Sequence, residues 1–402
     1  MKNKLQDLLS GMRVWATVAV LYVVVISGIP SAQAQSYKVL FQFRAGVDGA
    51  SPFGGLVSDP NGNLYGTTNI DGAFDSGVVF KLSPTRKETV LHSFSGSGGD
   101  GAYPLTGLVR DASGNLYGTT AQGGVYGGAC GGAGCGTVFK VDSAGTETVL
   151  HGFTGIPDGS TPYAGLVRDA AGNLYGTTLQ GGANEAGAVF RVDATGKETV
   201  LLSFDFSQIQ NGYAPYGGLA LDPAGNLYGT TEGGGTFGTG VVFKLDTTGT
   251  ETVLYNFGSQ STDGLTPTGN LIRDAANNLY GMTENGGTFG FGTVFKLDKN
   301  GNETLLHSFA GGKADGQAPF ISGLLRDAKG NLYGATSEGG PFDFGIVFKL
   351  DSTGKETVLH SFTGKGGKIP YGSLIRDKAG NLYGTTSGGG TYGGGLVFKL
   401  TP

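Results

Sequence analysis

The fold can be inferred from residues 107–120, which read Gly-Leu-Val-Arg-Asp-Ala-Ser-Gly-Asn-Leu-Tyr-Gly-Thr-Thr. Two short runs rich in β-branched and apolar residues flank an Asp-x-x-Gly-Asn turn, and this pattern is typical of a tight β-hairpin. A Gly-rich loop follows, and then come strand-like runs at residues 136–142 and 146–153, separated by a second Asp-x-x-Gly turn. Helical spacing is absent. The unit therefore predicts four short antiparallel strands.

The same unit occurs seven times. Its Asn-Leu-Tyr-Gly signature begins at Asn63, Asn115, Asn173, Asn226, Asn278, Asn331 and Asn381, with successive copies 50 to 58 residues apart. One small antiparallel unit cannot bury its apolar faces alone, so neighbouring units must pack against each other. Repeated four-stranded units of this length are typical of a β-propeller.

The two ends of the repeat region indicate how the units close. Residues 37–43 match the fourth strand of a unit but lack the first three, whereas residues 395–400 match a third strand that lacks a fourth. A ring lets the N-terminal strand complete the last unit and removes two unpaired sheet edges. We therefore predict an all-β, seven-bladed β-propeller of four-stranded blades. An open solenoid is the alternative, and it would leave residues 37–43 away from residues 396–400.

The strings G-L-V-x-D-x-x-G-N-L-Y-G-T-T and V-F-K-L-D-x-x-G-x-E-T-V-L-H-S-F resemble the GloVer tandem-repeat family, over residues 37–399. The resemblance implies an exported bacterial repeat protein and no defined activity. Anchored members of that family carry a C-terminal sorting segment, which this sequence does not show, so the resemblance does not imply surface attachment.

Residues 1–34 have the composition of a secretory signal peptide. Lys2, Lys4 and Arg13 precede an apolar run, and Ala32-Gln33-Ala34 forms a small-residue cleavage site. An uncleaved anchor is the alternative, but the run is shorter than the roughly twenty residues that span a bilayer. We expect an exported chain, extracellular or periplasmic, whose residues 35–402 form one propeller domain without a membrane span. Those residues carry 24 basic and 31 acidic side chains, a balance that argues against nucleic acid as a partner.

Cys130 and Cys135 lie in one Gly-rich insertion, residues 127–136. In an exported protein two such cysteines can join as a disulfide. A metal site would need further ligands, and the insertion supplies none. We predict the disulfide, and no cofactor.

All four histidines, His92, His151, His307 and His360, occupy one position in the fourth strand of their units, and Tyr255, Leu202 and Gln42 are aligned with them elsewhere. The same position in different blades cannot converge on one ion or substrate, so we interpret these histidines as structural. No Walker loop, dinucleotide fingerprint, zinc-protease motif or nucleophile elbow is present. We therefore assign no catalytic residue and no metal ligand.

The long loops between second and third strands, and between one blade and the next, share one face of a propeller, and function concentrates in such loops. On that face, Gly-Gly-aromatic sequences, acidic residues and Asp-Gly turns recur, giving the candidate binding residues Tyr126, Glu232, Phe237, Glu284, Phe289, Glu338, Phe342, Tyr392, Asp100, Asp263 and Asp315. They could form a rim for a ligand. Alternatively, the aromatics fill gaps between blades and the Asp-Gly sequences form ordered turns.

Positions that differ between units are better indicators of a site, because a feature present in nearly every blade is explained by packing. These are the cysteine insertion, an insertion at residues 205–211, and Ser58 and Leu221, where five other units have arginine before aspartate. We expect a non-catalytic extracellular binding or scaffolding propeller for a glycan or protein ligand. The alternative is a hydrolase or lyase acting on a carbohydrate or lactone through two nearby carboxyl groups.

Overall fold

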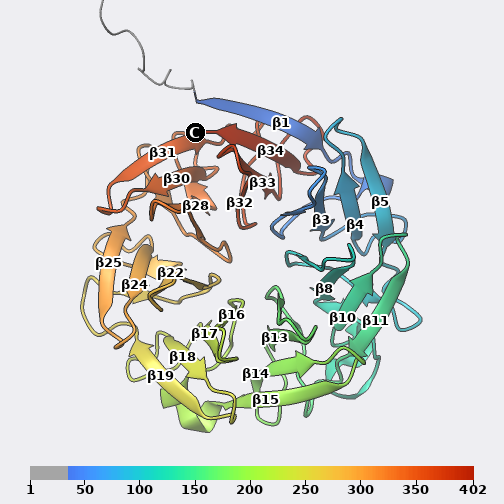
Figure 1. The fold of residues 1–402 in the computed structure, drawn as a ribbon, viewed down its shortest axis with the longest axis horizontal. Coiled ribbons are helices and arrows are strands. Elements are labelled where there is room, and N and C mark those ends of the chain that lie inside the picture. The colour runs from blue at the N-terminus through green and yellow to red at the C-terminus, as the bar shows by residue number, and fades with distance from the viewer. Residues whose placement is uncertain (1–34) are drawn as a thin grey trace, which may run out of the picture. The chain divides into compact units, whose positions relative to one another are not determined.

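Seven four-stranded antiparallel sheets surround a central channel in the computed structural model, as Figure 1 shows. The structure describes residues 35–402, and residues 36–402 form one compact unit. The predicted signal peptide lies outside the described residues. Within residues 35–402, none of the helices has the length and apolar character needed to cross a membrane.

Each blade runs from a short inner strand at the channel to an outer strand at the circumference. The blades are numbered 1 to 7 in the order of their inner strands. The inner strands are β2 (Val57–Ser58), β7 (Val109–Arg110), β12 (Val167–Arg168), β16 (Ala220–Leu221), β21 (Ile272–Arg273), β27 (Leu325–Arg326) and β32 (Ile375–Arg376). The second strands are β3 (Leu64–Thr68), β8 (Leu116–Thr120), β13 (Leu174–Thr178), β17 (Leu227–Thr231), β22 (Leu279–Thr283), β28 (Leu332–Thr336) and β33 (Leu382–Thr386).

The outer half of each blade is longer. The third strands are β4 (Val78–Leu82), β10 (Thr137–Val141), β14 (Glu185–Val192), β18 (Val241–Leu245), β24 (Thr293–Leu297), β30 (Ile346–Leu350) and β34 (Leu396–Thr401). The outer strands are β5 (Glu88–Ser93), β11 (Glu147–Gly152), β15 (Glu198–Asp205), β19 (Glu251–Asn256), β25 (Glu303–Ser308), β31 (Glu356–Ser361) and β1 (Ser36–Gln42).

The loops contain three small two-stranded sheets and three 3-10 helices. The sheets pair β6 (Gly101–Ala102) with β9 (Gln122–Gly123), β20 (Gly264–Leu265) with β23 (Asn285–Gly286), and β26 (Gly316–Gln317) with β29 (Glu338–Gly339). The 3-10 helices are η1 (Gly46–Asp48), η2 (Gly128–Ala133) and η3 (Phe206–Asn211).

The N-terminal strand closes the ring, as predicted. Strand β1 pairs antiparallel with β34, with Tyr37 opposite Leu400 and Val39 opposite Phe398. The seventh blade therefore has the order β1-β34-β33-β32, and the open solenoid is excluded. This register places Phe41 opposite Val397 and Gln42 opposite Leu396. The position equivalent to the histidines is therefore occupied by Phe41, and our alignment of Gln42 with them is wrong by one residue.

The core between blades consists of paired phenylalanines. At every interface a phenylalanine at the end of one outer strand, or just after it, packs against the phenylalanine in the third strand of the next blade. In the pair Phe94–Phe139 the ring centroids are 5.0 Å apart with planes at 67°, and Phe43 and Phe80 make the same contact across the closing blade at 5.1 Å. Edge-to-face pairs of this kind combine large apolar burial with favourable ring electrostatics.

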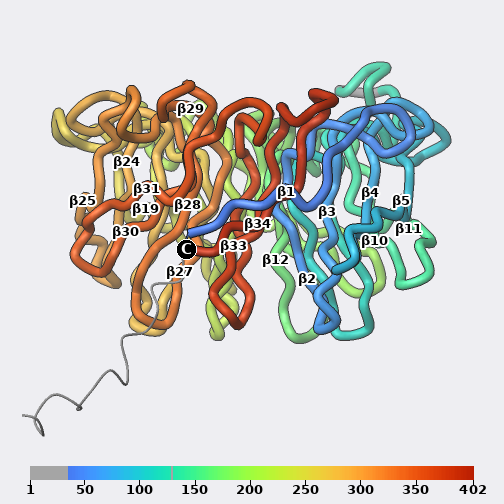
Figure 2. Tube along the Cα trace, turned by 90° about the horizontal axis from the view of Figure 1, so that it is seen from above, coloured from blue at the N-terminus to red at the C-terminus, as the bar shows by residue number. Residues whose placement is uncertain are grey.

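The two tight turns of each unit are hydrogen-bonded as their sequences predict. Asp111 accepts hydrogen bonds from the backbone N–H of Asn115 at 2.8 Å, from its side-chain amide at 2.7 Å and from the Tyr117 hydroxyl at 3.0 Å. Gly114 takes a φ of 91°, which only glycine adopts without strain. Figure 2 shows these hairpins along its lower edge, which we call the hairpin face, and the longer loops along the upper edge, which we call the loop face.

Three of the repeated arginines, Arg168, Arg326 and Arg376, lie over a tyrosine ring of the preceding blade. The guanidinium of Arg326 lies 5.5 Å from the ring centroid of Tyr280 in the preceding blade, and that of Arg376 lies 5.9 Å from the Tyr333 ring. Lys399 lies over the ring of Tyr383 in its own blade, at 5.7 Å. The arginine–tyrosine contacts link neighbouring blades on the hairpin side.

Candidate functional site

A repeated turn on the loop face directs one side chain from each blade toward the mouth of the channel. A proline precedes this side chain in all seven blades, and the residue before the proline has a positive φ although it is not glycine, as at Ser51 (55°) and Ala214 (54°). Hydrogen bonds hold this strained conformation: the N–H of Ala214 donates to the oxygen of Ala186 in the preceding blade, and its carbonyl accepts from Glu232.

The side chain after the proline is aromatic in five blades, and these five residues form a continuous chain of ring contacts. Ring centroids are 4.8 Å apart for Phe53–Tyr371, 5.7 Å for Tyr371–Phe320, 6.0 Å for Phe320–Tyr216 and 5.3 Å for Tyr216–Tyr163. We call this set the aromatic belt. Phe53, Tyr163 and Tyr371 of this belt line a channel cavity of about 300 Å³.

Carboxyl groups lie beside part of the belt only. Glu232 and Glu284 follow the second strands of blades 4 and 5 and are half-buried, so burial raises the pKa of both carboxyls. The charges of Glu232 and Glu338 raise the pKa of Glu284 further. Burial, followed by Tyr163, Glu232 and Glu284, also raises the pKa of the Tyr216 hydroxyl. The mouth is therefore acidic on one side, which breaks the sevenfold likeness of the ring.

A groove of about 570 Å³ extends from this acidic side across blades 3 and 4. Its apolar walls come from Ile156, Phe206, Tyr213 and Tyr216, and its polar groups include Ser160, Gln180, Glu185 and Glu232. Cys130 lies at one edge. Tyr216 and Glu232 belong to both the groove and the mouth, so the two form one continuous surface.

Both insertions that distinguish this sector in the sequence contribute to the groove. Strands β14 and β15 each have eight residues, and residues 206–211 continue as η3, whose N-terminus is capped by Asp205 accepting from the N–H of Ser207 at 2.7 Å. The extension places Phe206 against Tyr213, with centroids 5.0 Å apart, while Phe206 remains 53% exposed. The predicted Cys130–Cys135 disulfide is present and holds the facing loop.

The five candidate aromatics of the Gly-Gly loops do not fill gaps between blades. Their exposed fractions are 42% for Tyr126, 50% for Phe237, 56% for Phe289, 56% for Phe342 and 53% for Tyr392. The phenylalanine pairs fill the interfaces instead. Because the five occupy one repeat position in five blades, they are distributed around the loop face rather than gathered in the groove.

The acidic candidates lie in different parts of the ring. Glu232 and Glu284 lie at the mouth, and Glu338 accepts a hydrogen bond from the side chain of Gln317 at 2.7 Å. Asp100, Asp263 and Asp315 lie between outer strands, where their carboxylates accept hydrogen bonds from the chain itself. Asp100, for example, accepts from the N–H groups of Ser95 and Gly101, both at 2.7 Å.

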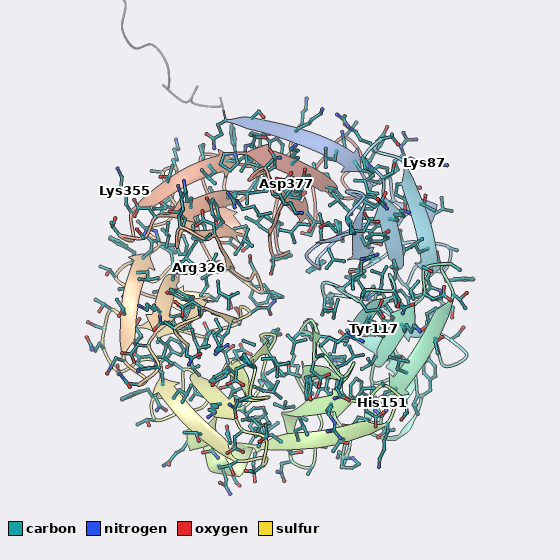
Figure 3. All side chains as sticks on the ribbon, viewed as in Figure 1. Lys87, Tyr117, His151, Arg326, Lys355 and Asp377 are labelled. Atoms are coloured by element: carbon teal, nitrogen blue, oxygen red, sulfur yellow. A yellow bond between two sulfur atoms is a disulfide. The ribbon has the colours of Figure 1, made fainter. Side chains whose placement is uncertain are left out.

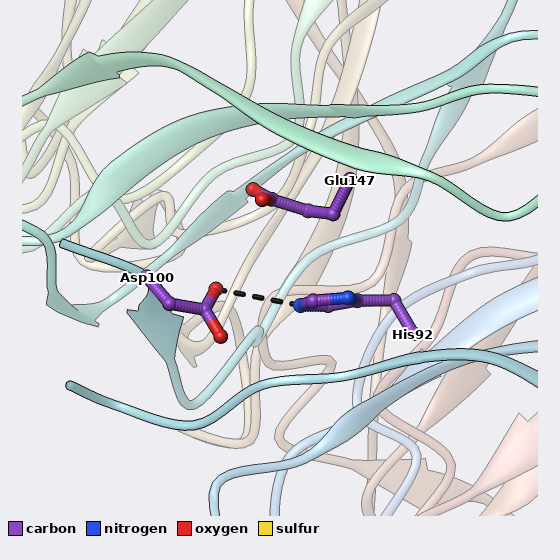
Figure 4. Close-up of side chains that lie close together, drawn as sticks. All are labelled: His92, Asp100 and Glu147. Carbon is purple, nitrogen blue, oxygen red and sulfur yellow. Dashed lines mark hydrogen bonds and ion pairs between the residues drawn. The ribbon is translucent and has the colours of Figure 1, made fainter. Parts of the chain in front are cut away.

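Those aspartates form a second group of clusters, which we call the outer clusters. Each combines a histidine or tyrosine of one outer strand, the aspartate of the connecting loop and a glutamate of the next outer strand. Figure 3 shows one of the histidines, His151, at the circumference, and Figure 4 shows His92, Asp100 and Glu147 facing one another. The Nε2 of His92 lies 3.4 Å from Oδ1 of Asp100. Burial and then the Asp100 charge raise the pKa of Glu147 to about 7.

The aromatic belt, the groove and the outer clusters were not predicted from the sequence. The belt could have been predicted from the sequence, because an aromatic residue follows the repeated proline in five blades. No single unit indicates the groove or the outer clusters, because each is assembled from more than one blade.

The solved structures that the chain resembles are β-propellers. A streptogramin B lyase structure superposes with a TM-score of 0.60 at 12% identity, covering 91% of this chain and 97% of the lyase. The extracellular domain of a putative hybrid two component system from B. thetaiotaomicron gives 0.58 at 13% identity, covering 92% of this chain and 41% of that one. At such low identity these matches show the fold alone. No curated protein matches the sequence.

The family assignment comes from the repeat itself. The model of the Gloeobacter/Verrucomicrobia repeat matches residues 29–130, 123–275 and 259–402, which together span the whole propeller. The chain therefore belongs to the Gloeobacter/Verrucomicrobia repeat family.

Proposed function

We propose that this chain is an exported, non-catalytic binding propeller whose ligand is an oligosaccharide held in the groove across blades 3 and 4. The observation that carries the proposal is the concentration of the insertions in one sector, where they contribute to the walls of a groove. Ligand sites are typically concave, mostly apolar surfaces with a few convergent polar groups. Sugar rings present apolar C–H faces and polar edges, and the groove offers aromatic faces beside carboxyl, amide and hydroxyl groups.

The residues divide by role. The rings of Phe206, Tyr213 and Tyr216 offer stacking faces, while Glu232 and Gln180 offer hydrogen-bonding groups. The groove continues into the channel mouth through Tyr216 and Glu232, so a chain of several sugar units fits better than one.

The test is a glycan array followed by calorimetry with the purified propeller. We expect Tyr216→Ala and Phe206→Ala to weaken glycan binding at least tenfold each, equivalent to a loss of about 1.4 kcal/mol. Phe289→Ala is the matched control, since Phe289 is 56% exposed on the same face but does not line the groove. Glycan binding that survives both groove variants, or no glycan binding at all, contradicts the proposal.

Export is supported by the signal-like residues 1–34 and by the Cys130–Cys135 disulfide, since such bonds persist in oxidising compartments. N-terminal sequencing of the protein recovered outside the cytoplasm should read from Gln35. An N-terminus at Met1 or within the apolar run contradicts cleavage.

A hydrolase or lyase acting on the same class of ligand is the second candidate, favoured by Glu284. Its half-buried carboxyl, with a raised pKa, lies beside the charges of Glu232 and Glu338, and a raised pKa suits a general acid. Turnover of a bound polysaccharide that is abolished by Glu284→Gln would replace the binding proposal with this one.

A further inference from the structure

Two of the outer clusters have the composition of a metal site. In the first, His92 comes from β5 of blade 1, Glu147 from β11 of blade 2, and Asp100 from the connection between them. In the second, His307, Asp315 and Glu356 occupy the same positions in blades 5 and 6. In each cluster one imidazole nitrogen and two carboxylate oxygens lie within 4.8 Å of one another.

The ligand atoms in these clusters are incompletely hydrogen-bonded within the described residues. Oε1 of Glu147 and Oε1 of Glu356 are buried and have no hydrogen-bond partner there, and the same holds for Nε2 of His307. That nitrogen lies 3.5 Å from Oδ2 of Asp315, at the limit of a hydrogen bond. Leaving buried polar atoms unpaired is costly, and a shared cation would contact all of them.

The backbone already orients the aspartate in both clusters. Asp315 accepts from the N–H of Ala310 and from the N–H of Gly316, each at 2.6 Å. Hydrogen bonds of this kind to a ligating carboxylate fix its direction and keep it ionised. The remaining lone pairs are available to a cation.

We propose that the His92–Asp100–Glu147 and His307–Asp315–Glu356 clusters each bind one divalent transition-metal ion, such as Zn²⁺, that joins neighbouring blades at the circumference. One imidazole and two carboxylates are ligands that Zn²⁺ accepts, at bond lengths of about 2.0 to 2.2 Å, with water completing the tetrahedron. Small side-chain movements bring atoms within 4.8 Å of each other to that distance from a common centre.

The same ring contains two natural controls. In the Tyr255–Asp263–Glu303 cluster a tyrosine replaces the histidine and donates its hydroxyl to Oδ2 of Asp263 at 2.9 Å, so no nitrogen ligand is present. In the third histidine cluster, Nε2 of His151 lies only 3.0 Å from Oδ2 of Asp158, whose Oδ1 accepts from the N–H and hydroxyl of Thr154. In that cluster Oε1 of Glu198 is also buried without a hydrogen-bond partner among the described residues, but the imidazole and the aspartate are already paired with each other.

The test measures Zn²⁺ bound to the chelator-treated, dialysed protein, purified with a tag that lacks histidine. Isothermal titration with zinc chloride should give two sites per chain, one site in His92→Gln or in His307→Gln, and none in the double variant. His151→Gln is the matched control and should keep two sites. The melting temperature of the wild type, but not of the double variant, should rise with Zn²⁺ and remain unchanged with Mg²⁺.

Two further measurements keep the test decisive if a histidine variant folds poorly. The double variant Glu147→Gln and Glu356→Gln leaves both histidines in place and should also lose Zn²⁺. Uptake by the wild type should be weaker at pH 6 than at pH 8, because protein groups bind such an ion in their deprotonated forms. Absence of Zn²⁺ uptake at micromolar free metal, or equal uptake by the wild type and either double variant, overturns the proposal.

Discussion

The two faces of the ring are built by the same seven units, yet the units differ little in sequence on the hairpin face and much more on the loop face. On the hairpin face each aspartate makes the same hydrogen bonds within its own turn, as at Asp111 and Asp222. On the loop face the turns share a backbone path, but aromatic, acidic and inserted residues vary from blade to blade. Uniform positions therefore build the ring, and the irregular sector across blades 3 and 4 is where a ligand can be recognised.

The largest contrast is expected between two phenylalanines of one blade. Phe295 is 1% exposed and packs against Phe257, whereas Phe289 on the loop face is 56% exposed. Phe295→Ala should lower the free energy of unfolding by about 3 to 5 kcal/mol, and Phe289→Ala by less than about 0.5 kcal/mol. Chemical denaturation of both variants checks this. Equal losses would mean that the loop-face aromatics also belong to the core.

A smaller effect is expected on the hairpin face. Asp222 accepts from the N–H groups of Ala224 and Asn226 at 2.9 Å, and from the Asn226 amide and the Tyr228 hydroxyl. Asp222→Ala should cost about 1 to 3 kcal/mol, because these donors lose a charged acceptor. Asp222→Asn keeps one acceptor oxygen and should cost less. An alanine variant as stable as the wild type would show that the repeated aspartate has another purpose.

The outer clusters should make stability depend on pH. Burial and then Asp263 raise the pKa of Glu303 to about 7. A carboxyl whose pKa is raised on folding stabilises the fold fully below its unfolded pKa, and this stabilisation is lost as the pH rises through about 7. The metal-free wild type should therefore melt at a lower temperature at pH 8 than at pH 5. Glu303→Gln should show a smaller drop, and an identical drop would contradict the assignment.

The smallest effect on stability is expected in the groove. Phe206 is 53% exposed, and its ring contacts the ring of Tyr213. Phe206→Ala should change the free energy of unfolding by less than about 1 kcal/mol, since little apolar surface is lost from the core. Thermal denaturation beside the binding assay checks this. A loss as large as that of Phe295→Ala would place the insertion in the core and weaken its role in recognition.

The sequence was sufficient for the architecture because the same local rules recur seven times. Asp-x-x-Gly turns, alternating strands and the displaced strand at residues 37–43 all point to one closed ring. The outer clusters escaped prediction for a physical reason: Asp100 and Glu147 reach His92 only when two blades pack together. The shared repeat position correctly predicted that the four histidines lie in different blades. It gave no indication of the glutamate that the next blade places beside His92 and His307.

The assignment of candidate binding residues stays a prediction, whereas the fold is confirmed. Glu232 and Glu284 lie at the mouth, whereas Phe237 and Phe289 are spread around the ring. The insertion at residues 205–211 was recognised as a departure from the repeat, but its contact with the groove depends on how far β14 and β15 extend. That extension arises from pairing between Glu185 and Asp205, which no pattern in one strand reveals.

Pairing of β1 with β34 joins residues more than 350 positions apart, so the ring cannot exist until both have been made and have met. Until then the seventh sheet ends in an unsatisfied edge, with the N–H and C=O groups of residues 396–401 open to any strand that fits. A released strand from a second molecule has the same sequence as the correct one. Crowded, half-assembled chains are therefore at risk of exchanging first strands, and dilute conditions should favour self-closure.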